Sequence, residues 1–172
     1  MADDYLHIYL NDHLAGSTGG VELAERIAEN NEDNPLGEVM EGLAKEIDAD
    51  RDELQRLMDE LGVSRNAIKA AGAYLFEKLS QMKANGQLTG YSPLSRALEL
   101  EMLHMGITGK LQLWGALHAT FGPALGDFDF ELLIERAKSQ RDRVEELRLA
   151  AAREAFGESV QPAKAAISGA PA

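Results

Sequence analysis

Carboxylates and a histidine at helical spacing are the residues of this chain that are best suited to chemistry. Glu46 and Asp50 are four residues apart, so a helix places both on one face. Glu101 and His104 form a Glu-x-x-His pattern, which also puts two metal-binding side chains on one helical face. Carboxylate-bridged di-iron bundles use a Glu from each of two helices and a Glu-x-x-His from each of the other two. A di-metal centre is therefore one chemistry that these residues can support.

Asp50 lies directly on the apolar stripe of its predicted helix, with Glu46 one turn earlier. Two carboxylates on a core-facing surface repel each other, and burial costs each of them several kcal/mol unless something compensates. The buried negative charge can be compensated in three ways: by a metal ion, by protonation of one carboxyl group, or by Arg and Lys side chains that reach inward from other helices. The sequence thus predicts a neutralised interior charge cluster without deciding how it is neutralised.

Five segments of the chain repeat their apolar residues with helical spacing. They run from about Asp4 to Asn30, Pro35 to Leu61, Arg65 to Lys83, Pro93 to Phe121, and from Asp127 or Asp129 to Phe156. Asn34 and Ser92 each precede a proline, which is the signal for an N-cap followed by the first residue of a helix. Gly62 predicts a C-cap for the second segment. The pattern predicts an all-α protein, built as an up-and-down bundle of four to five helices.

Glycine interrupts the first segment and also marks the start of a tail. Residues 15–20 are poor helix-forming sequence, because each helical glycine costs up to about 1 kcal/mol relative to alanine. Either a close helix contact or a break is expected there. Gly, Ala, Ser and Pro dominate after residue 156. We expect a single helical-bundle domain over residues 1–156 and a flexible, weakly packed tail over residues 157–172.

Composition excludes several classes of protein. The formal net charge is −12, which opposes attraction to nucleic acid or to anionic lipid. The chain has no cysteine, so disulfides and thiolate metal sites are excluded. No apolar run approaches the roughly 18 residues that span a bilayer, and the charged start does not have the order of a signal peptide. We therefore expect a cytoplasmic protein without a membrane partner.

The layout of these residues resembles the ferritin-like superfamily. Asp12 and His13 lie on the first helix, Glu46 and Asp50 on the second, and Glu101-x-x-His104 on the fourth. The stretches at residues 10–16 and 92–96 are in detail similar to a bacterial branch of that superfamily. The resemblance covers about residues 4–156 and implies the fold more than the activity. Members with intact sites bind two iron or manganese ions and carry out ferroxidase, oxygenase or peroxide chemistry.

The fifth segment departs from the family pattern, because it contains no histidine. Its apolar stripe instead points Gln140 or Arg141 inward, and an inward arginine supplies the positive charge that a metal otherwise provides. The candidate metal ligands, for iron or manganese, are Glu46, Asp50, Glu99, Glu101, His104 and His13. The candidate members of an interior charge network are Asp12, Glu77, Lys78, Lys110, Gln140 and Arg141.

Three functions remain as hypotheses from the sequence. The first is a ferritin-like bundle with a degenerate or absent di-metal site and a structural or interaction role. The second is a di-iron or di-manganese carboxylate protein with redox or oxygen chemistry. The third is helix-turn-helix DNA binding around residues 54–75, which the acidic preceding helix and the Ala-rich following helix disfavour. Because ferritin-like bundles often pair side by side, the resemblance also implies a homodimer.

Overall fold

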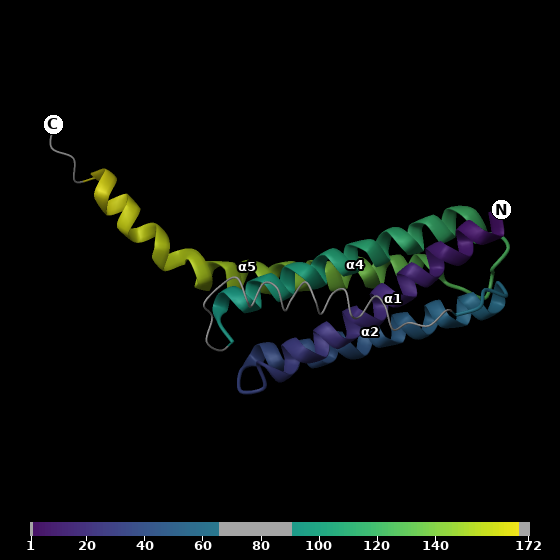
Figure 1. Cartoon of the computed structure of the whole chain (residues 1–172), viewed down its shortest axis with the longest axis horizontal. Helices are drawn as coiled ribbons and strands as arrows, with labels where there is room; N and C mark the ends of the chain where they lie inside the picture. Colours follow the sequence, from purple (N-terminus) through teal and green to yellow (C-terminus); the bar gives the residue numbers. More distant parts are fainter. Residues whose placement is uncertain (1, 66–90, 169–172) are drawn as a thin grey trace.

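The computed structural model describes the backbone of residues 2–65 and 91–168, and the side chains of residues 4–65 and 91–157. Within these ranges the chain forms four α-helices and no strand. They are α1 (Ala2–Glu29), α2 (Pro35–Glu60), α4 (Pro93–Phe121) and α5 (Phe130–Ser168) (Figure 1). The predicted all-α class is confirmed, and a helical bundle fits. The helix predicted over Arg65 to Lys83, together with the network candidates Glu77 and Lys78, lies outside the described residues except for its first residue.

The four helices form two antiparallel hairpins that pack along their length (Figure 1). α1 packs mainly on α2, α4 packs mainly on α5, and the two hairpins meet chiefly where α1 contacts α4. α2 and α4 run in the same direction, so α2 ends and α4 begins at opposite ends of the bundle (Figure 1).

The helix ends follow from capping residues that the sequence reveals. The Asn34 side chain accepts a hydrogen bond from the backbone N–H of Leu36, and the Ser92 hydroxyl accepts one from the backbone N–H of Ser95 at 3.1 Å. Gly62 has a φ of +64°, the left-handed conformation that glycine adopts without strain just after a helix. The predicted starts of α2 and α4 and the end of α2 are thus confirmed.

The apolar core consists of two clusters, one in each half of the bundle. One cluster contains Ile27, Leu43, Ile47, Leu103, Ile107 and Val144, and the other contains Leu10, Leu54, Leu57, Leu113, Trp114 and Ala137, each with further residues. Three polar residues separate the clusters along their helices: Asp50 on α2, Lys110 on α4 and Gln140 on α5. The interior charges therefore lie at the midpoint of the bundle, between two apolar halves.

Two sequence expectations about helix continuity need correction. α1 runs unbroken through its glycines, and a Cβ atom added at Gly16 or Gly20 meets nothing within 4 Å. Neither a break nor a tight helix contact at these two glycines therefore explains them. α5 continues to Ser168 instead of ending near Phe156, and its C-terminal part extends beyond the other three helices (Figure 1). Sequence of high helix propensity, rich in Ala and Glu, precedes Gly157, so the single glycine does not end the helix there.

None of the helices in the described part of the chain combines the length and the apolar character that crossing a membrane requires.

Candidate functional site

The midpoint of the bundle holds a set of ion pairs and hydrogen bonds that we call the central network. Its members are Glu46, Asp50, Lys110, Arg136, Gln140 and Arg143. Asp50 is only 1% exposed, and both of its carboxylate oxygens have a cationic partner. Lys110 bonds one oxygen, and the Arg136 guanidinium pairs with the other. The buried charge predicted on the apolar stripe of α2 is therefore compensated by cations from two other helices.

Glu46 completes the central network on the outer side of Asp50. The Arg143 guanidinium donates to both carboxylate oxygens, with one N···O distance of 3.0 Å. Gln140 is fully buried and accepts a hydrogen bond from Lys110 at 2.5 Å, while its amide donates to Glu46 at 3.3 Å. The Arg143 hydrogen bonds hold the pKa of Glu46 below its ordinary value, against the opposing effect of burial. The described ion pairs thus join two carboxylates to three cations.

Lys110 experiences opposing effects because it is buried beside a carboxylate. Burial lowers the pKa of its ammonium group, and the adjacent Asp50 opposes that shift. Arg136 nearby lowers this pKa further, since a like charge disfavours the ammonium form. A metal cation placed between Glu46 and Asp50 would meet the same repulsion from Lys110 and Arg136. The protein has therefore already supplied the positive charge that a metal centre would otherwise bring.

A second set of polar side chains, the end network, lies where the α1–α2 turn meets the start of α4. Its members are Arg26, Asn31, Tyr91, Arg96 and Glu99. Asn31 donates to the Ile27 carbonyl at 2.7 Å and to the Tyr91 hydroxyl at 3.0 Å, and it accepts from Arg96 at 3.0 Å. Arg26 pairs with Glu99 at 3.1 Å, so this predicted metal ligand also has a cationic partner. Burial raises the pKa of Tyr91 to about 12.

Glu101 and His104 lie at the surface of the bundle, on the side of α4 that is next to α5. Glu101 is more than half exposed and lies 3.6 Å from Arg148. His104 lies 3.9 Å from Glu145, which is itself bonded to Arg148. The apolar residues Leu100, Leu103 and Ile107 occupy the inward positions of α4 instead. The Glu-x-x-His pair is therefore separated from Glu46 and Asp50, contrary to the arrangement that the resemblance implies.

The remaining candidates are placed apart from one another. His13 is half-buried, its ring packs edge-on against Tyr9, and burial lowers its pKa, which the adjacent Asp12 opposes. Asp12 is exposed, so it is not an interior charge. Of the two residues of α5 predicted to point inward, Gln140 does, whereas Arg141 pairs with its exposed neighbour Asp142. Among the described residues, no three His, Asp or Glu side chains lie close enough together to hold a metal ion.

Sequence reasoning missed the arginines that do neutralise the interior. Arg136 and Arg143 flank the apolar stripe of α5, adjacent to the inward Ala137 and Val144. Long arginine side chains reach the interior from flanking positions while their stems cover apolar surface. A search for inward positions alone cannot find such residues. A search for arginines within one residue of the stripe would have found both.

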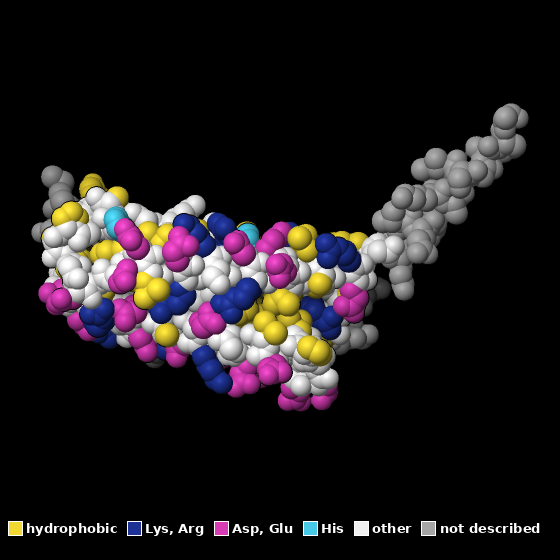
Figure 2. Space-filling view, turned by 180° about the vertical axis from the view of Figure 1, so that it is seen from behind, with side chains coloured by type: hydrophobic (Ala, Val, Ile, Leu, Met, Phe, Trp, Pro, Cys, Tyr) yellow, Lys and Arg dark blue, Asp and Glu magenta, His cyan; other side chains and the backbone are white. Residues whose placement is uncertain are grey.

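The face of the bundle shown in Figure 2 does not present its described Lys and Arg side chains as a single cluster, which is what nucleic acid requires. On the face shown in Figure 2, Lys and Arg side chains alternate with Asp and Glu, and apolar patches lie between them. The predicted helix-turn-helix region, residues 54–75, is described only to Arg65. That arginine is already paired with Asp59 and hydrogen-bonded to Gln55. The DNA-binding hypothesis gains no support from the described part of this region.

Comparison of the chain with family models, with curated proteins and with solved structures gives no match. The class that the described residues define is an all-α bundle with two interior polar networks.

Proposed function

We propose that this protein is a ferritin-like helical bundle in which protein cations replace the di-metal centre, and that its role is structural or one of binding and interaction. The observation that carries the proposal is Asp50, which is buried on α2, accepts a hydrogen bond from Lys110 and forms an ion pair with Arg136. A carboxylate this deeply buried requires compensation, and here two side chains provide it. No free carboxylate remains at this position to bind a metal.

The residues present do not fit the di-metal centre that the ferritin-like resemblance implies. Such a centre requires carboxylates and histidines from four helices around one point. Here Glu101 and His104 lie against Arg148 and Glu145 on the outside, and Glu99 lies with Arg26 in the end network. Bringing these ligands to Asp50 would need rotation of α4 and displacement of Lys110. The redox alternative is therefore disfavoured by geometry.

Elemental analysis of the protein, expressed with iron and manganese supplied and purified without chelators, tests the proposal. We expect less than about a tenth of an equivalent of either metal in folded protein, against about two equivalents for an intact di-metal bundle. Two equivalents that disappear in Glu101→Ala and His104→Ala would overturn the proposal in favour of the di-iron or di-manganese alternative. Circular dichroism of each sample confirms that the bundle is folded.

The interaction role has a separate test in the oligomeric state. The ferritin-like resemblance implies a homodimer, and side-by-side pairing of bundles buries an exposed helix face. Sedimentation velocity across a range of protein concentrations measures the mass in solution directly. A dimer supports a role in assembly. A monomer at all concentrations would exclude a second copy of the chain as the partner and leave other proteins as partners.

A further inference from the structure

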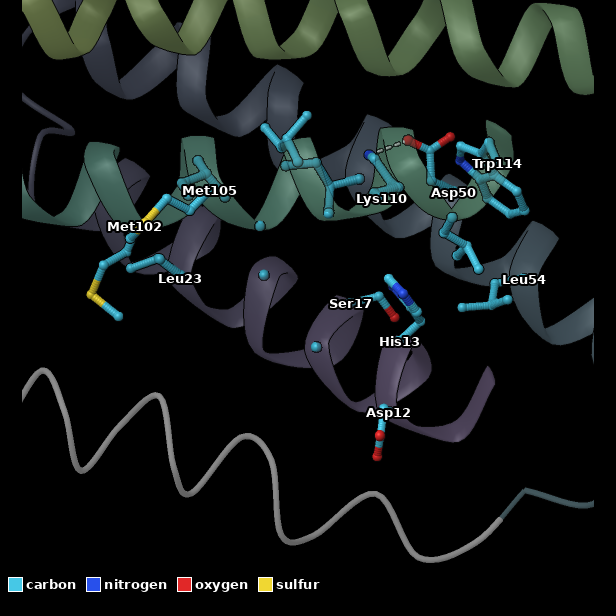
Figure 3. A pocket seen from close by; sticks show the side chains of 18 residues that line it. Asp12, His13, Ser17, Leu23, Asp50, Leu54, Met102, Met105, Lys110 and Trp114 are labelled. Carbon is cyan, nitrogen blue, oxygen red and sulfur yellow. Dashed lines mark hydrogen bonds and ion pairs between the residues drawn. The ribbon is translucent and has the colours of Figure 1, made fainter. Parts of the chain in front are cut away.

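A cavity of about 440 Å³ lies between α1 and α4, with α2 forming its third wall (Figure 3). This volume lies within the range of about 300–1,000 Å³ that is typical of small-molecule sites. Met102, Met105 and Leu23 lie at one end of the cavity, and Leu54 and Trp114 lie at the other (Figure 3). From Met102 to Trp114 the cavity follows twelve residues of α4, or about 18 Å of helix. The cavity is therefore elongated and mainly apolar.

Glycines account for the width of the cavity. Gly16 and Gly20 on α1 and Gly106 and Gly109 on α4 all line it, and a Cβ atom added at any of them meets nothing within 4 Å. Glycine destabilises a helix relative to alanine, and close packing does not require it at these four positions. The absence of side chains on the facing surfaces of two helices keeps the space between them open.

The polar end of the cavity offers hydrogen-bond donors. Trp114 is fully buried, and its indole Nε1–H has no hydrogen-bond partner among the described residues. The nitrogen side of the indole ring lies toward Asp50 and Lys110 (Figure 3). The Lys110 ammonium has three N–H groups, of which Asp50 and Gln140 account for two. A buried donor without an acceptor is costly, so this end of the cavity is suited to a ligand that brings an acceptor.

Charge at this end of the cavity favours a negative acceptor. The central network joins two carboxylates to three cations, which leaves one positive charge in excess among these groups. Burial lowers the pKa of His13 on the opposite wall, which favours its neutral form. Asp12 also lines the cavity, but it is exposed to water, where its charge is screened. A ligand carboxylate would balance the excess charge.

We propose that this cavity binds an apolar monocarboxylate of the fatty-acid type. Its carboxylate accepts hydrogen bonds from Lys110 and from the indole N–H of Trp114, and its alkyl chain runs along α4 toward Met102. The inference rests on the proposed function in one respect, since Lys110 has to be the cation at Asp50. The polar end selects the carboxylate, and the apolar walls retain the chain.

Trp114 is the single tryptophan of the chain, so its fluorescence reports on this site alone. The test titrates the full-length protein with dodecanoate, and separately with dodecanol, below the concentrations at which either aggregates. We expect a saturable change in emission with one equivalent of dodecanoate and binding at least about tenfold weaker for dodecanol, since one charge-assisted hydrogen bond is worth that factor or more. Equal binding of the alcohol would refute the carboxylate contact.

Two glycine variants separate cavity binding from non-specific adsorption. Gly106→Leu fills the cavity from α4, whereas Gly42→Leu adds the same side chain at an exposed position of α2 with nothing within 4 Å. We expect Gly106→Leu to lose dodecanoate binding at least about tenfold and Gly42→Leu to keep it. Unchanged binding in Gly106→Leu would overturn the proposal, as would the absence of dodecanoate binding to the parent protein.

Trp114→Phe and Lys110→Met test the two donors. Trp114→Phe removes one N–H donor, so we expect calorimetry to show a clear loss of dodecanoate binding and a smaller loss for dodecanol, whose neutral hydroxyl oxygen is the weaker acceptor. Lys110→Met should abolish the preference for the carboxylate over the alcohol, and circular dichroism shows whether this variant is folded.

Metal content, measured on the same parent sample, reports on the proposed function separately. A metal-free protein that does not bind dodecanoate refutes only the proposed ligand. A protein that contains two equivalents of metal refutes the proposal that protein cations replace the di-metal centre.

Discussion

The central network and the end network both bury a carboxylate between helices, but they stabilise it in different ways. Asp50 lies at the middle of α2 and depends on two cationic side chains from other helices. Glu99 lies near the α1–α2 turn, in a network where Arg26 is joined by neutral groups, Asn31 and Tyr91. One region is thus built almost entirely from charges, and the other mixes charges with amide, phenol and backbone groups.

The position of each network along the helices, at the middle or at an end, explains this difference. In the middle of a helix, every backbone N–H and C=O is used by the helix itself, so only side chains can neutralise a buried charge. At a helix end the last carbonyl groups are unsatisfied, and the Ile27 carbonyl accepts from Asn31 there. The central network should therefore be more sensitive to loss of a single side chain than the end network.

Lys110→Met should produce the largest loss of stability. It leaves Arg136 as the one cationic partner of the buried Asp50 among the described residues, and it removes the hydrogen bond to Gln140. We expect the free energy of unfolding to fall by about 3 kcal/mol or more, measured by urea titration. Lys45→Met, which removes an exposed lysine of α2, is the matched control and should change it by less than about 0.5 kcal/mol. Similar losses in both variants would contradict this account.

Arg26→Met should have a smaller effect, because the end network keeps its other polar groups. It removes a partner of the buried Glu99, and we expect a loss of about 2 kcal/mol in the same titration. The comparison between the networks predicts that Lys110→Met costs more than Arg26→Met. The reverse order would show that the neutral groups of the end network contribute little.

Tyr91→Phe should cost about 1 kcal/mol near neutral pH, because Asn31 loses one of its hydrogen bonds. Its pH dependence is more distinctive. The folded pKa of Tyr91 is about 12, above the ordinary value of 10, so its contribution is complete below about pH 10 and is lost as pH rises through 12. Difference spectra of tyrosinate ionisation, recorded with and without the substitution, measure this. Ionisation of Tyr91 at its ordinary pKa would show that the residue is not buried.

Glu46→Gln should have the smallest effect, because Glu46 and Arg143 are both partly exposed. We expect a loss below about 1 kcal/mol at pH 7. The pKa of Glu46 is lowered by Arg143, so its contribution is present above the ordinary value of 4.5 and is lost as pH falls through the folded pKa. Parent and variant should therefore converge in stability in acid. Parallel acid titrations, in which the difference stays constant, would contradict the pairing.

The starts of α2 and α4 and the end of α2 were predictable because each is encoded locally. Asn34, Ser92 and Gly62 cap their helices as their sequence neighbourhoods indicate. The end of α5 was not predictable in this way, because Gly157 alone does not stop a helix whose neighbours favour it. Whether the bundle is ferritin-like, with four or five helices, stays a prediction.

The interior site was predictable in part. Asp50 stands on an apolar stripe, and this pattern alone predicts a compensated buried charge. Lys110 was among the predicted members of an interior network, but its pairing with Asp50 and the role of Arg136 were harder to predict, since both come from helices sixty or more residues away. The helix rotation that turns His104 outward also depends on tertiary packing. Periodicity fixes which residues share a face, but not which residues on other helices meet that face.

The pairing of the helices into two hairpins has a consequence for the lifetime of the native state. Each hairpin packs residues that are close in sequence, so we expect both to form early during folding. Asp50 belongs to the first hairpin, whereas Lys110 and Arg136 belong to the second, so their bonds form only when the hairpins dock. Loss of Lys110 should therefore accelerate unfolding more than it slows folding. We therefore expect the central network to lengthen the lifetime of the folded bundle chiefly by slowing unfolding.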